Sequence, residues 1–281
     1  MALCSMKELL DQAEKQNAAV GSFSVGNMEM VLGAVRAAEE MNTPIILQIA
    51  EVRLKHAPLE LMAPMMIAAA KRAKVDVAVH FDHGLTPAVI RQALELGFTS
   101  VMYDGSHKPL AENIAGTKEM VELASRYGAC VEAELGMIGK DEAGNVCGEA
   151  IYTDPKDAVT FAREAPVTAL AVAIGNAHGH YDGKPQLRFD ILEQIHETVG
   201  LPLVLHGGSG ISAAEFRRCI DLGVRKINIA TANFDAFPMG AKQYFEQTGK
   251  YNFFSLSDSV TEGMYENVKE HIQIFKNRDE A

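Results

Sequence analysis

The strongest constraint on the fold is a regular alternation of short β-branched or aliphatic runs with longer segments of helical period. Eight such runs occur along the 281 residues, and helical segments separate them. This alternation is typical of parallel β-α units, and eight units close into a barrel. The sequence therefore predicts an α/β fold, a (β/α)8 TIM barrel. The expected strands are residues 19–23, 44–49, 75–80, 100–103, 129–134, 169–174, 203–206 and 226–229.

One domain accounts for the whole chain. Helical segments are expected at residues 29–41, 59–73, 87–96, 110–126, 155–164, 190–199 and 213–222, with an extra C-terminal helix at 261–276. Single barrels reach about 250 residues, and no Pro/Ser-rich linker or low-complexity tract divides this sequence. We therefore interpret residues 1–281 as a single catalytic domain.

Charge and composition narrow the classes of partner. The formal net charge is −11 and the sequence contains no basic stripe, so nucleic acid is not an expected partner. No run of about 18 apolar residues is present, and the four widely spaced cysteines form no C-x-x-C pair. We expect a cytoplasmic protein that has no signal peptide and no membrane span and that acts on a small molecule.

Polar residues gather where the expected strands end. A barrel of this kind carries its active site at the carboxyl ends of its strands. In chain order, these ends bring Asp82, His83, Asp104, Glu134, Asn176, His178 and His206, and the eighth run contains Asn228. Three histidines and three carboxylates, from segments far apart in the sequence, are thus expected on one rim.

The three histidines predict a metal site. Neutral imidazoles suit Zn²⁺, and three protein ligands leave a fourth position open to substrate. A lone histidine is more often structural, but His83, His178 and His206 on one rim favour zinc. On the residues alone, His180 remains a rival ligand because it lies two residues past His178. His80 is expected to point into the barrel, since it precedes Asp82 by two residues.

The carboxylates are candidates for proton transfer and for cation binding. Asp82 is placed just past the third strand, beside His83, where it could exchange a proton with a substrate hydroxyl. Its alternative role is that of an acceptor that orients an imidazole. Asp104 and Glu134 could hold a second cation or an alternative metal position, or act only through their charge.

A glycine-rich turn predicts a phosphate site. Gly207, Gly208, Ser209 and Gly210 follow the seventh run, and a turn of this composition can point backbone N–H groups at an anion. Phosphate binds recurrently near the seventh and eighth strands of such barrels. Glycines also simply form turns, but the position directly after His206 favours the phosphate interpretation.

Six motifs follow one another along the chain. They are VHFDHG (79–84), SVMYDGSH (100–107), VEAELG (131–136), AVAIGNAHG (171–179), PLVLHGGSG (202–210) and KINIAT (226–231). Together they resemble the class II fructose-bisphosphate and tagatose-bisphosphate aldolases, from about residue 5 to residue 276 and with compatible spacing. The resemblance implies an enzyme that splits or joins a ketose phosphate at a bond next to dihydroxyacetone phosphate.

The resemblance also implies roles for individual residues. The expected zinc ligands are His83, His178 and His206, with Asp104 and Glu134 as alternative or second-cation ligands. The expected phosphate-binding residues are Gly179, Gly207, Gly208, Ser209, Asn228, Ala230 and Thr231, with a monovalent cation (Na⁺ or K⁺) nearby. Asp82 would transfer the proton, and Glu142, on the loop after the fifth strand, is a candidate for the enolising base.

The same family resemblance implies mechanism and assembly. Zinc would act as a Lewis acid on the ketone and hydroxyl oxygens of dihydroxyacetone phosphate and stabilise its enediolate. No Schiff-base lysine is then needed. Because the family's ligand is the histidine of Ala-His-Gly, the resemblance favours His178 over His180. Relatives are commonly dimers or tetramers, so we expect a homo-oligomer.

The chain departs from the family where the far end of the substrate would bind. Ser24 stands where relatives usually carry asparagine, and residues 259–262 lack the arginine that helps to bind a far phosphate. Arg53 or Lys55 could replace it, and an arginine would also suit a carboxylate. We therefore expect the phosphate next to the ketone to be required, and a hydroxyl or carboxylate tail to be accepted at least as well as a second phosphate.

Two other functions share most of these residues. A metal-dependent isomerase or epimerase would use the same enediolate chemistry, and release of dihydroxyacetone phosphate from ketose phosphates distinguishes it from an aldolase. A non-catalytic sugar-phosphate sensor would need an intact phosphate loop with a broken catalytic set. Asp82 and the three histidines are all present, which argues against a sensor.

Overall fold

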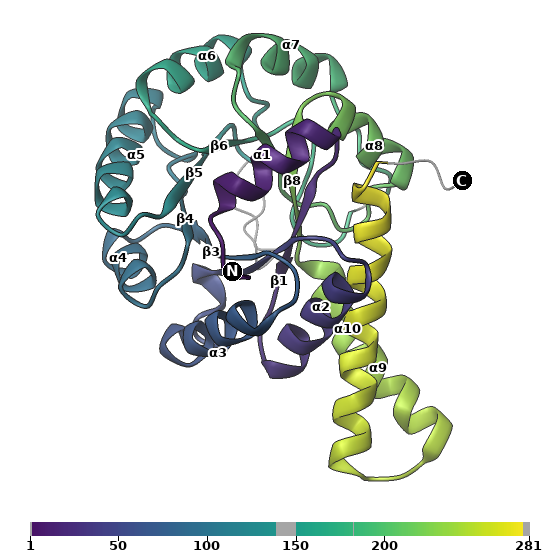
Figure 1. Cartoon of the computed structure of the whole chain (residues 1–281). Helices are drawn as coiled ribbons and strands as arrows, with labels where there is room; N and C mark the ends of the chain where they lie inside the picture. Colours follow the sequence, from purple (N-terminus) through teal and green to yellow (C-terminus); the bar gives the residue numbers. More distant parts are fainter. Residues whose placement is uncertain (1, 139–149, 182, 278–281) are drawn as a thin grey trace.

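Eight parallel strands form the closed barrel that the sequence predicts, and the predicted fold class is confirmed. The computed structural model describes residues 2–138, 150–181 and 183–277. Neighbouring strands follow the chain order, and β1 pairs with β8 to close the barrel (Figure 1). The strands are β1 Val20–Ser24, β2 Ile45–Ala50, β3 Val77–Gly84, β4 Ser100–Tyr103, β5 Cys130–Leu135, β6 Ala169–Val172, β7 Leu203–Leu205 and β8 Val224–Ile229.

Each strand sends alternate side chains into the barrel and toward the surrounding helices. On β2, Ile45, Leu47 and Ile49 belong to the large apolar cluster that includes the helices, while Ile46 belongs to a smaller cluster inside the barrel. Both faces of the strand are therefore buried. Burial on both faces is why the strands of a parallel barrel are recognisable as short aliphatic runs.

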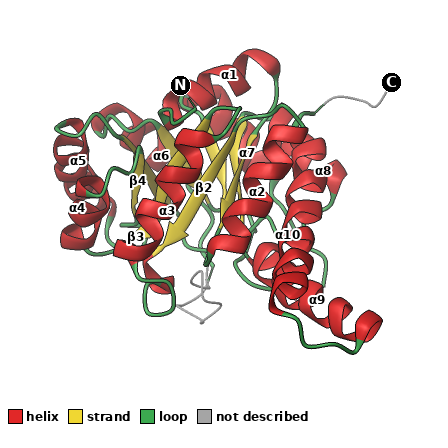
Figure 2. Ribbon diagram, turned by 60° about the horizontal axis from the view of Figure 1, so that its bottom comes forward, coloured by secondary structure: helices red, strands yellow, loops and turns green. Residues whose placement is uncertain are grey.

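A ring of helices covers the outside of the barrel (Figure 2). The N-cap residues Asn27 and Ser212 accept from backbone N–H groups in the first turns of their helices and so fix where α2 and α8 begin. The helices that follow β1 to β7 are α2 Met28–Glu40, α3 Leu59–Arg72, α4 Pro87–Glu95, α5 Leu110–Ser125, α6 Pro155–Glu164, α7 Phe189–Val199 and α8 Ala213–Asp221. A short 3-10 helix, η1 Glu51–Arg53, lies between β2 and α3.

The amino-terminal mouth of the barrel is closed by a helix that was not predicted from the sequence. In Figure 1, α1 Met6–Gln16 lies across the opening of the barrel. Its buried face and the barrel interior share one apolar cluster, formed by Met6, Leu9, Leu10, Ala13, Val20, Ile46, Ala78, Ala169, Ala171 and Val204. The first four of these residues have the spacing of one helical face, which is the signal that could have predicted α1.

Two helices at the carboxyl-terminal end project beyond the ring (Figures 1 and 2). α9 Thr231–Thr248 was not predicted, and α10 Phe253–Phe275 begins at residue 253 rather than at residue 261. Pro238 lies inside α9 and obscured it, because proline usually ends a helix. α10 packs along both α2 and α9. In the described parts of the chain, no helix combines the length and the apolar character needed to cross a membrane.

Candidate active site

The third strand carries two of the predicted site residues. β3 continues to Gly84, so Asp82 lies inside the strand and not past its end, where the sequence pattern placed it. The register with β4 shifts between Phe81 and Gly84, and His83 has a φ of 43°. Regular alternation would point Asp82 and His83 to opposite faces. The local irregularity lets both side chains face the end of the barrel.

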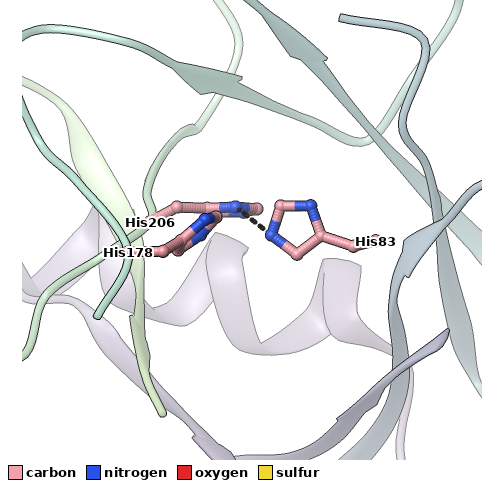
Figure 3. A group of neighbouring side chains, drawn as sticks. All are labelled: His83, His178 and His206. Atoms are coloured by element: carbon pink, nitrogen blue, oxygen red, sulfur yellow. Dashed lines mark hydrogen bonds between the residues drawn. The ribbon is translucent and has the colours of Figure 1, made fainter. Parts of the chain in front are cut away.

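Three histidines meet at the carboxyl end of the barrel (Figure 3). His83 comes from β3, His178 from the segment after β6, and His206 directly follows β7. Their ligand nitrogens lie within 4.8 Å of one another, and all three residues are buried. The rival ligand His180 is 77% exposed and lies 3.4 Å from Asp235 of α9. The structure thus brings together the predicted set with His178.

The hydrogen bonds of the imidazoles fit a metal ion. His83 Nδ1 lies 2.9 Å from Asp104 Oδ2, and His206 Nε2 lies 2.8 Å from Glu132 Oε1. Because ionised carboxylates only accept, these nitrogens carry the protons, and His83 Nε2 and His206 Nδ1 present lone pairs. Those two nitrogens face each other at 2.9 Å. Two lone pairs at this distance repel unless a cation or a proton lies between them.

Carboxylates around the cluster favour positive charge at its centre. Burial acts to lower the pKa of His83, but Asp82, Asp104 and Glu134 raise it well above its usual value. Burial lowers the pKa of His206, and the positive charge of His83 adds to that effect. Burial also raises the pKa of Glu134, as does the charge of Asp104. The carboxylates therefore favour a positive charge at His83, which a metal ion or a proton can supply.

Asp82 lies beside the histidines with both of its oxygens held. Oδ1 accepts from Nδ2 of Asn228, and Oδ2 accepts from Nε2 of Gln48, each at 3.1 Å. The carboxylate is fully buried, and its Oδ2 lies 4.0 Å from His83 Nε2. Asp82 thus lies beside the histidine cluster, with its orientation fixed by two amides.

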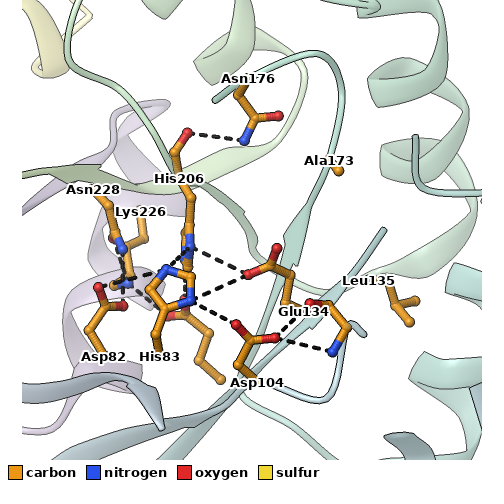
Figure 4. Close-up of polar contacts among 12 residues, drawn as sticks. Asp82, His83, Asp104, Glu134, Leu135, Ala173, Asn176, His206, Lys226 and Asn228 are labelled. Carbon is orange, nitrogen blue, oxygen red and sulfur yellow. Dashed lines mark hydrogen bonds and ion pairs between the residues drawn. The ribbon is translucent and has the colours of Figure 1, made fainter. Parts of the chain in front are cut away.

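A second group of possible ligands lies on another side of His83. Asp104 and Glu134 join His83 in a set whose ligand atoms also lie within 4.8 Å of one another. In Figure 4, these two carboxylates lie on the opposite side of His83 from Asp82. The structure therefore brings both predicted carboxylates to the cluster, where they could hold a cation in a different position.

The glycine-rich turn after β7 forms a small pocket together with the start of α9. The pocket is lined by His178, Gly179, Gly207, Ser209, Asn228, Ala230 and Thr231. Gly207 has a φ of 63°, and a Cβ there would collide with the carbonyl oxygen of Ala177. Gly208 instead donates its N–H to the carbonyl of Asn228. The pocket contains the predicted phosphate set apart from Gly208, and the start of α9 adds a helix terminus that favours anions.

The residues expected near the far end of the substrate are more scattered. Arg53 lies in η1, with its guanidinium carbon 4.8 Å from the centre of the Phe234 ring on α9. Lys55 is exposed. Glu262 lies inside α10 and pairs with Arg36 of α2 at 2.5 Å. The negative charge of Glu262 is therefore paired with Arg36.

The remaining expectations concern single residues. His80 points into the barrel as predicted, and its Nδ1 lies 2.9 Å from Ser100 Oγ. Ser24 is buried and accepts a hydrogen bond from Nε2 of Gln48 at 3.0 Å, so it joins the polar contacts around the aspartate of β3. Glu142 lies outside the described residues.

The buried polar residues of the barrel interior that were not predicted include Gln48, Glu132 and Lys226. Two of them precede a predicted residue of the same strand by two positions, Glu132 before Glu134 and Lys226 before Asn228. Residues two apart on a strand share a face. The alternation that placed His80 inside the barrel therefore also places Glu132 and Lys226 there.

Comparison with known proteins shows which family the chain belongs to. Residues 4–280 match the family model described as "Fructose-bisphosphate aldolase class-II". A probable fructose-bisphosphate aldolase of Bacillus subtilis (strain 168) is 41% identical over 236 residues, which cover 83% of this chain and 83% of the relative. A 6-phospho-5-dehydro-2-deoxy-D-gluconate aldolase of Halalkalibacterium halodurans is 37% identical over 285 residues, 100% of this chain and 99% of its own length.

A solved structure supports the same assignment. The crystal structure of the YdjI aldolase from Escherichia coli K12 has a TM-score of 0.86 to this chain at 34% identity, and the match covers 97% of each chain. The family match itself spans nearly all of the sequence and includes the histidine cluster, the carboxylates and the glycine-rich turn. This protein therefore belongs to the class II fructose-bisphosphate aldolase family and is an aldolase, a lyase that acts on carbon–carbon bonds.

Proposed function

We propose that this aldolase uses zinc and reversibly cleaves a ketose phosphate to dihydroxyacetone phosphate and an aldehyde. The observation that carries the proposal is the placement of three buried imidazoles, an anion pocket and Asp82 at one end of the barrel. His178 belongs both to the histidine cluster and to the lining of the pocket. A phosphate in the pocket therefore holds the neighbouring ketone close to the cluster.

The proposed metal site uses the nitrogens that face the centre of the cluster. Its ligands are His83, His178 and His206. When bound there, zinc polarises the ketone and hydroxyl oxygens of the substrate as a Lewis acid. Asp104 and Glu134 offer an alternative position or a site for a second cation. A monovalent cation (Na⁺ or K⁺) near the pocket is also proposed, because membership of the family implies one there.

Proton transfer is assigned to Asp82. In the cleavage direction, a base removes the proton from the hydroxyl on the carbon that becomes the aldehyde, and in the reverse direction the same group returns it. The amides of Asn228 and Gln48 hold the carboxylate of Asp82 in one orientation for this step. The proton on the carbon of dihydroxyacetone phosphate needs a second base. Glu142 remains the candidate for that base.

For the far end of the substrate, we propose a hydroxyl or carboxylate rather than a phosphate. Residues 259–262 offer no arginine, and Glu262 is paired with α2. Arg53 lies in η1, which directly follows β2 at the carboxyl end of the barrel. A planar guanidinium suits a carboxylate. The full-length relative from Halalkalibacterium halodurans supports this choice, because its printed name describes a sugar acid with a single phosphate.

A panel of ketose 1-phosphates with matched carboxylate, hydroxyl and phosphate tails tests the proposal. We expect dihydroxyacetone phosphate to be released, with kcat/KM for the carboxylate or hydroxyl tail at least equal to that for the bisphosphate. Arg53→Ala should lower kcat/KM for the carboxylate tail by about 10–100-fold, the value of one charge-assisted hydrogen bond. Lys55→Ala, at an exposed neighbouring position, is the matched control and should change little.

Two results would contradict the proposal. If the bisphosphate is preferred by orders of magnitude and Arg53→Ala removes that preference, Arg53 binds a far phosphate. If the ketose phosphates rearrange without release of dihydroxyacetone phosphate, the chain is an isomerase or epimerase that shares the enediolate chemistry.

We propose a homo-oligomer, a dimer or a tetramer, because α9 and α10 form an arm that projects beyond the ring of helices. The exposed aromatic side chains at its tip are Tyr251 (94%), Phe253 (71%) and Phe254 (75%). Exposed aromatic patches mark interfaces more often than solvated surface. Sedimentation velocity should show an oligomer that a Phe253→Ser and Phe254→Ser double variant weakens, and a monomeric parent would contradict this.

A cytoplasmic location is proposed because Cys4, Cys130 and Cys219 are free thiols.

A further inference from the structure

We propose that the buried ion pair of Lys226 and Glu132 is a positioning device that links the metal ligand His206 to the proton-transfer residue Asp82. The inference rests on the proposed zinc-aldolase function and deepens it. Lys226 and Glu132 are both fully buried in the barrel interior, and neither is assigned a role in the binding or reaction of the substrate. Their contacts reach the proposed metal ligand His206 on one side and, through Asn228, the proton-transfer residue Asp82 on the other.

Lys226 is the branch point of these contacts. Its Nζ lies 2.9 Å from Glu132 Oε2 and donates to Asn228 Oδ1 at 2.7 Å. A buried ammonium is costly unless it is paired and hydrogen-bonded. Lys226 therefore has one ion-pair partner, Glu132, and one hydrogen-bond acceptor, Asn228. Figure 4 shows Lys226 and Asn228 beside Asp82 and His206. The ammonium of Lys226 therefore contacts both Glu132 and Asn228.

The first branch reaches the metal cluster. Glu132 Oε1 accepts from His206 Nε2 at 2.8 Å, while its other oxygen is held by Lys226. With Nε2 occupied as the donor, the lone pair of His206 is on Nδ1, which faces His83. A carboxylate behind a metal-binding histidine fixes the ring and its tautomer in this way. Glu132 thus turns the correct nitrogen of His206 toward the metal.

The second branch reaches the proton-transfer residue. An asparagine amide can be placed in two orientations that exchange its oxygen and nitrogen. Because Lys226 can only donate, Asn228 must present its oxygen to Lys226 and its Nδ2 to Asp82 Oδ1. The flipped amide would set donor against donor at Lys226 and acceptor against acceptor at Asp82. Lys226 thus makes Asn228 a donor to Asp82.

The acidic groups around Lys226 do not need a further metal ion. His80, Asp82 and Glu132 form a set whose ligand atoms lie within 4.8 Å of one another. His80 Nε2 lies 3.7 Å from Asp82 Oδ1 and 3.7 Å from Glu132 Oε2. The ammonium of Lys226 already contacts Glu132 and supplies positive charge here. These groups therefore support the metal site of the three histidines instead of forming a second one.

Zinc affinity, measured by competition with a chelating dye, tests the first branch. Glu132→Gln keeps the shape of the side chain and removes its charge, and we expect zinc to bind about 10–100-fold more weakly. Lys226→Met should weaken zinc binding in the same direction. The double variant should lose no more than the worse single variant, because both act through one hydrogen bond to His206. Unchanged affinity in Glu132→Gln, or losses that add, would overturn the proposal.

Turnover at saturating zinc tests the second branch. Lys226→Met should lower kcat by about tenfold or more, because the hydrogen bond from Asn228 to the Asp82 carboxylate is no longer enforced. Asn228→Ala should lower kcat in the parent but change kcat little in the Lys226→Met background. Because Asn228 also lines the anion pocket, an effect on KM is expected in both backgrounds, and the comparison is made on kcat at saturating substrate. Independent effects of the two substitutions on kcat would contradict a shared route.

Two controls distinguish a loss of positioning from a loss of folding stability and from a failure of the proposed function. Val204→Ala opens a cavity in the apolar part of the same barrel interior and should lower the melting temperature while zinc affinity stays at the parent value. If Lys226→Met does not fold, the zinc affinity of Glu132→Gln alone decides the first branch. A parent that binds zinc and releases dihydroxyacetone phosphate while the Glu132 and Lys226 variants match it would refute only this inference. A parent that does neither would refute the proposed function.

Discussion

The two ends of the barrel differ although the same strands build both. Toward the amino-terminal end, inward positions such as Val20 on β1 and Val204 on β7 are apolar, and α1 covers them. Two residues farther along the chain, the inward positions hold Ser22 on β1 and His206 directly after β7. Two residues span about 7 Å. The change from apolar core to reactive site thus takes place within one layer of side chains.

The apolar amino-terminal end of the barrel therefore contributes mainly to folding stability, and the polar carboxyl end contributes mainly to binding and reaction. Each square ångström of apolar surface buried at the amino-terminal end contributes about 25 cal/mol to folding. Polar groups at the carboxyl end are costly when buried and must be hydrogen-bonded, as Asp82 is by Asn228 and Gln48. We therefore expect substitutions at the carboxyl end to change binding and rate, and substitutions at the other end to change the free energy of unfolding.

The largest effect should come from the histidine that separates the two ligand hypotheses. His178→Ala removes a buried nitrogen of the cluster, and bound zinc should fall to background, a greater loss than the about 10–100-fold cost of removing an outer partner. His180→Ala, two residues away at an exposed position, should retain stoichiometric zinc. Zinc content after dialysis, measured by atomic absorption, checks both variants. The reverse ranking would make His180 the ligand.

The next largest effect should be on rate without loss of metal. Asp82→Asn keeps the size of the side chain but removes its ability to take up a proton, so kcat should fall about 10²–10⁴-fold. Zinc content should stay at the parent level. If the variant turns over at a rate near that of the parent, or loses its zinc, Asp82 only orients an imidazole.

At the amino-terminal end, the expected effect is on folding alone. Leu9→Ala in α1 leaves a cavity against the barrel interior and should lower the free energy of unfolding by about 2–5 kcal/mol. Zinc affinity and kcat should match the parent at temperatures where the variant is folded. Urea unfolding and zinc titration of the same sample check this, and a coupled loss of zinc affinity would show that the two ends are not independent.

The smallest expected effect is the pH dependence of zinc affinity. The pKa of His83 is raised, so below that pKa the ring is protonated and zinc must displace the proton. Apparent zinc affinity should therefore rise with pH, by roughly tenfold per pH unit for one proton, and level off above the raised pKa. Asp104→Asn removes a carboxylate that raises this pKa, so levelling off should begin at lower pH. An affinity independent of pH would contradict the raised pKa.

The same division explains how much of the fold could be predicted from the sequence. All eight strands were found because each is a short aliphatic run between helical segments. α1 was missed because it precedes the repeated pattern, and α9 because Pro238 suggested a break. β3 was ended too early because the polar Asp82 and His83 do not resemble a buried strand. Polar site residues at the carboxyl end of the barrel thus interrupt the apolar pattern by which a strand is recognised in the sequence.

The sequence predicted the candidate site residues at the strand ends, but not the charged residues that lie inside the strands. His83, His178 and His206 were found because they stand at or near strand ends, where barrel sites lie. Glu132 and Lys226 sit one layer lower, inside strands, and become visible only when the two-residue alternation is applied to charged residues. The tautomers of the imidazoles, which fit them to a metal, depend on contacts between strands that no single segment encodes.

The most direct test of the central claim is aldol cleavage by protein stripped of metal. A chelator should abolish release of dihydroxyacetone phosphate from a ketose 1-phosphate, and stoichiometric zinc should restore it, because three neutral imidazoles without thiolate bind zinc reversibly. After the same treatment, Asp82→Asn should recover its zinc but keep its lowered kcat. Full turnover by the stripped protein would contradict the assignment of the carboxyl end of the barrel as a metal-dependent active site.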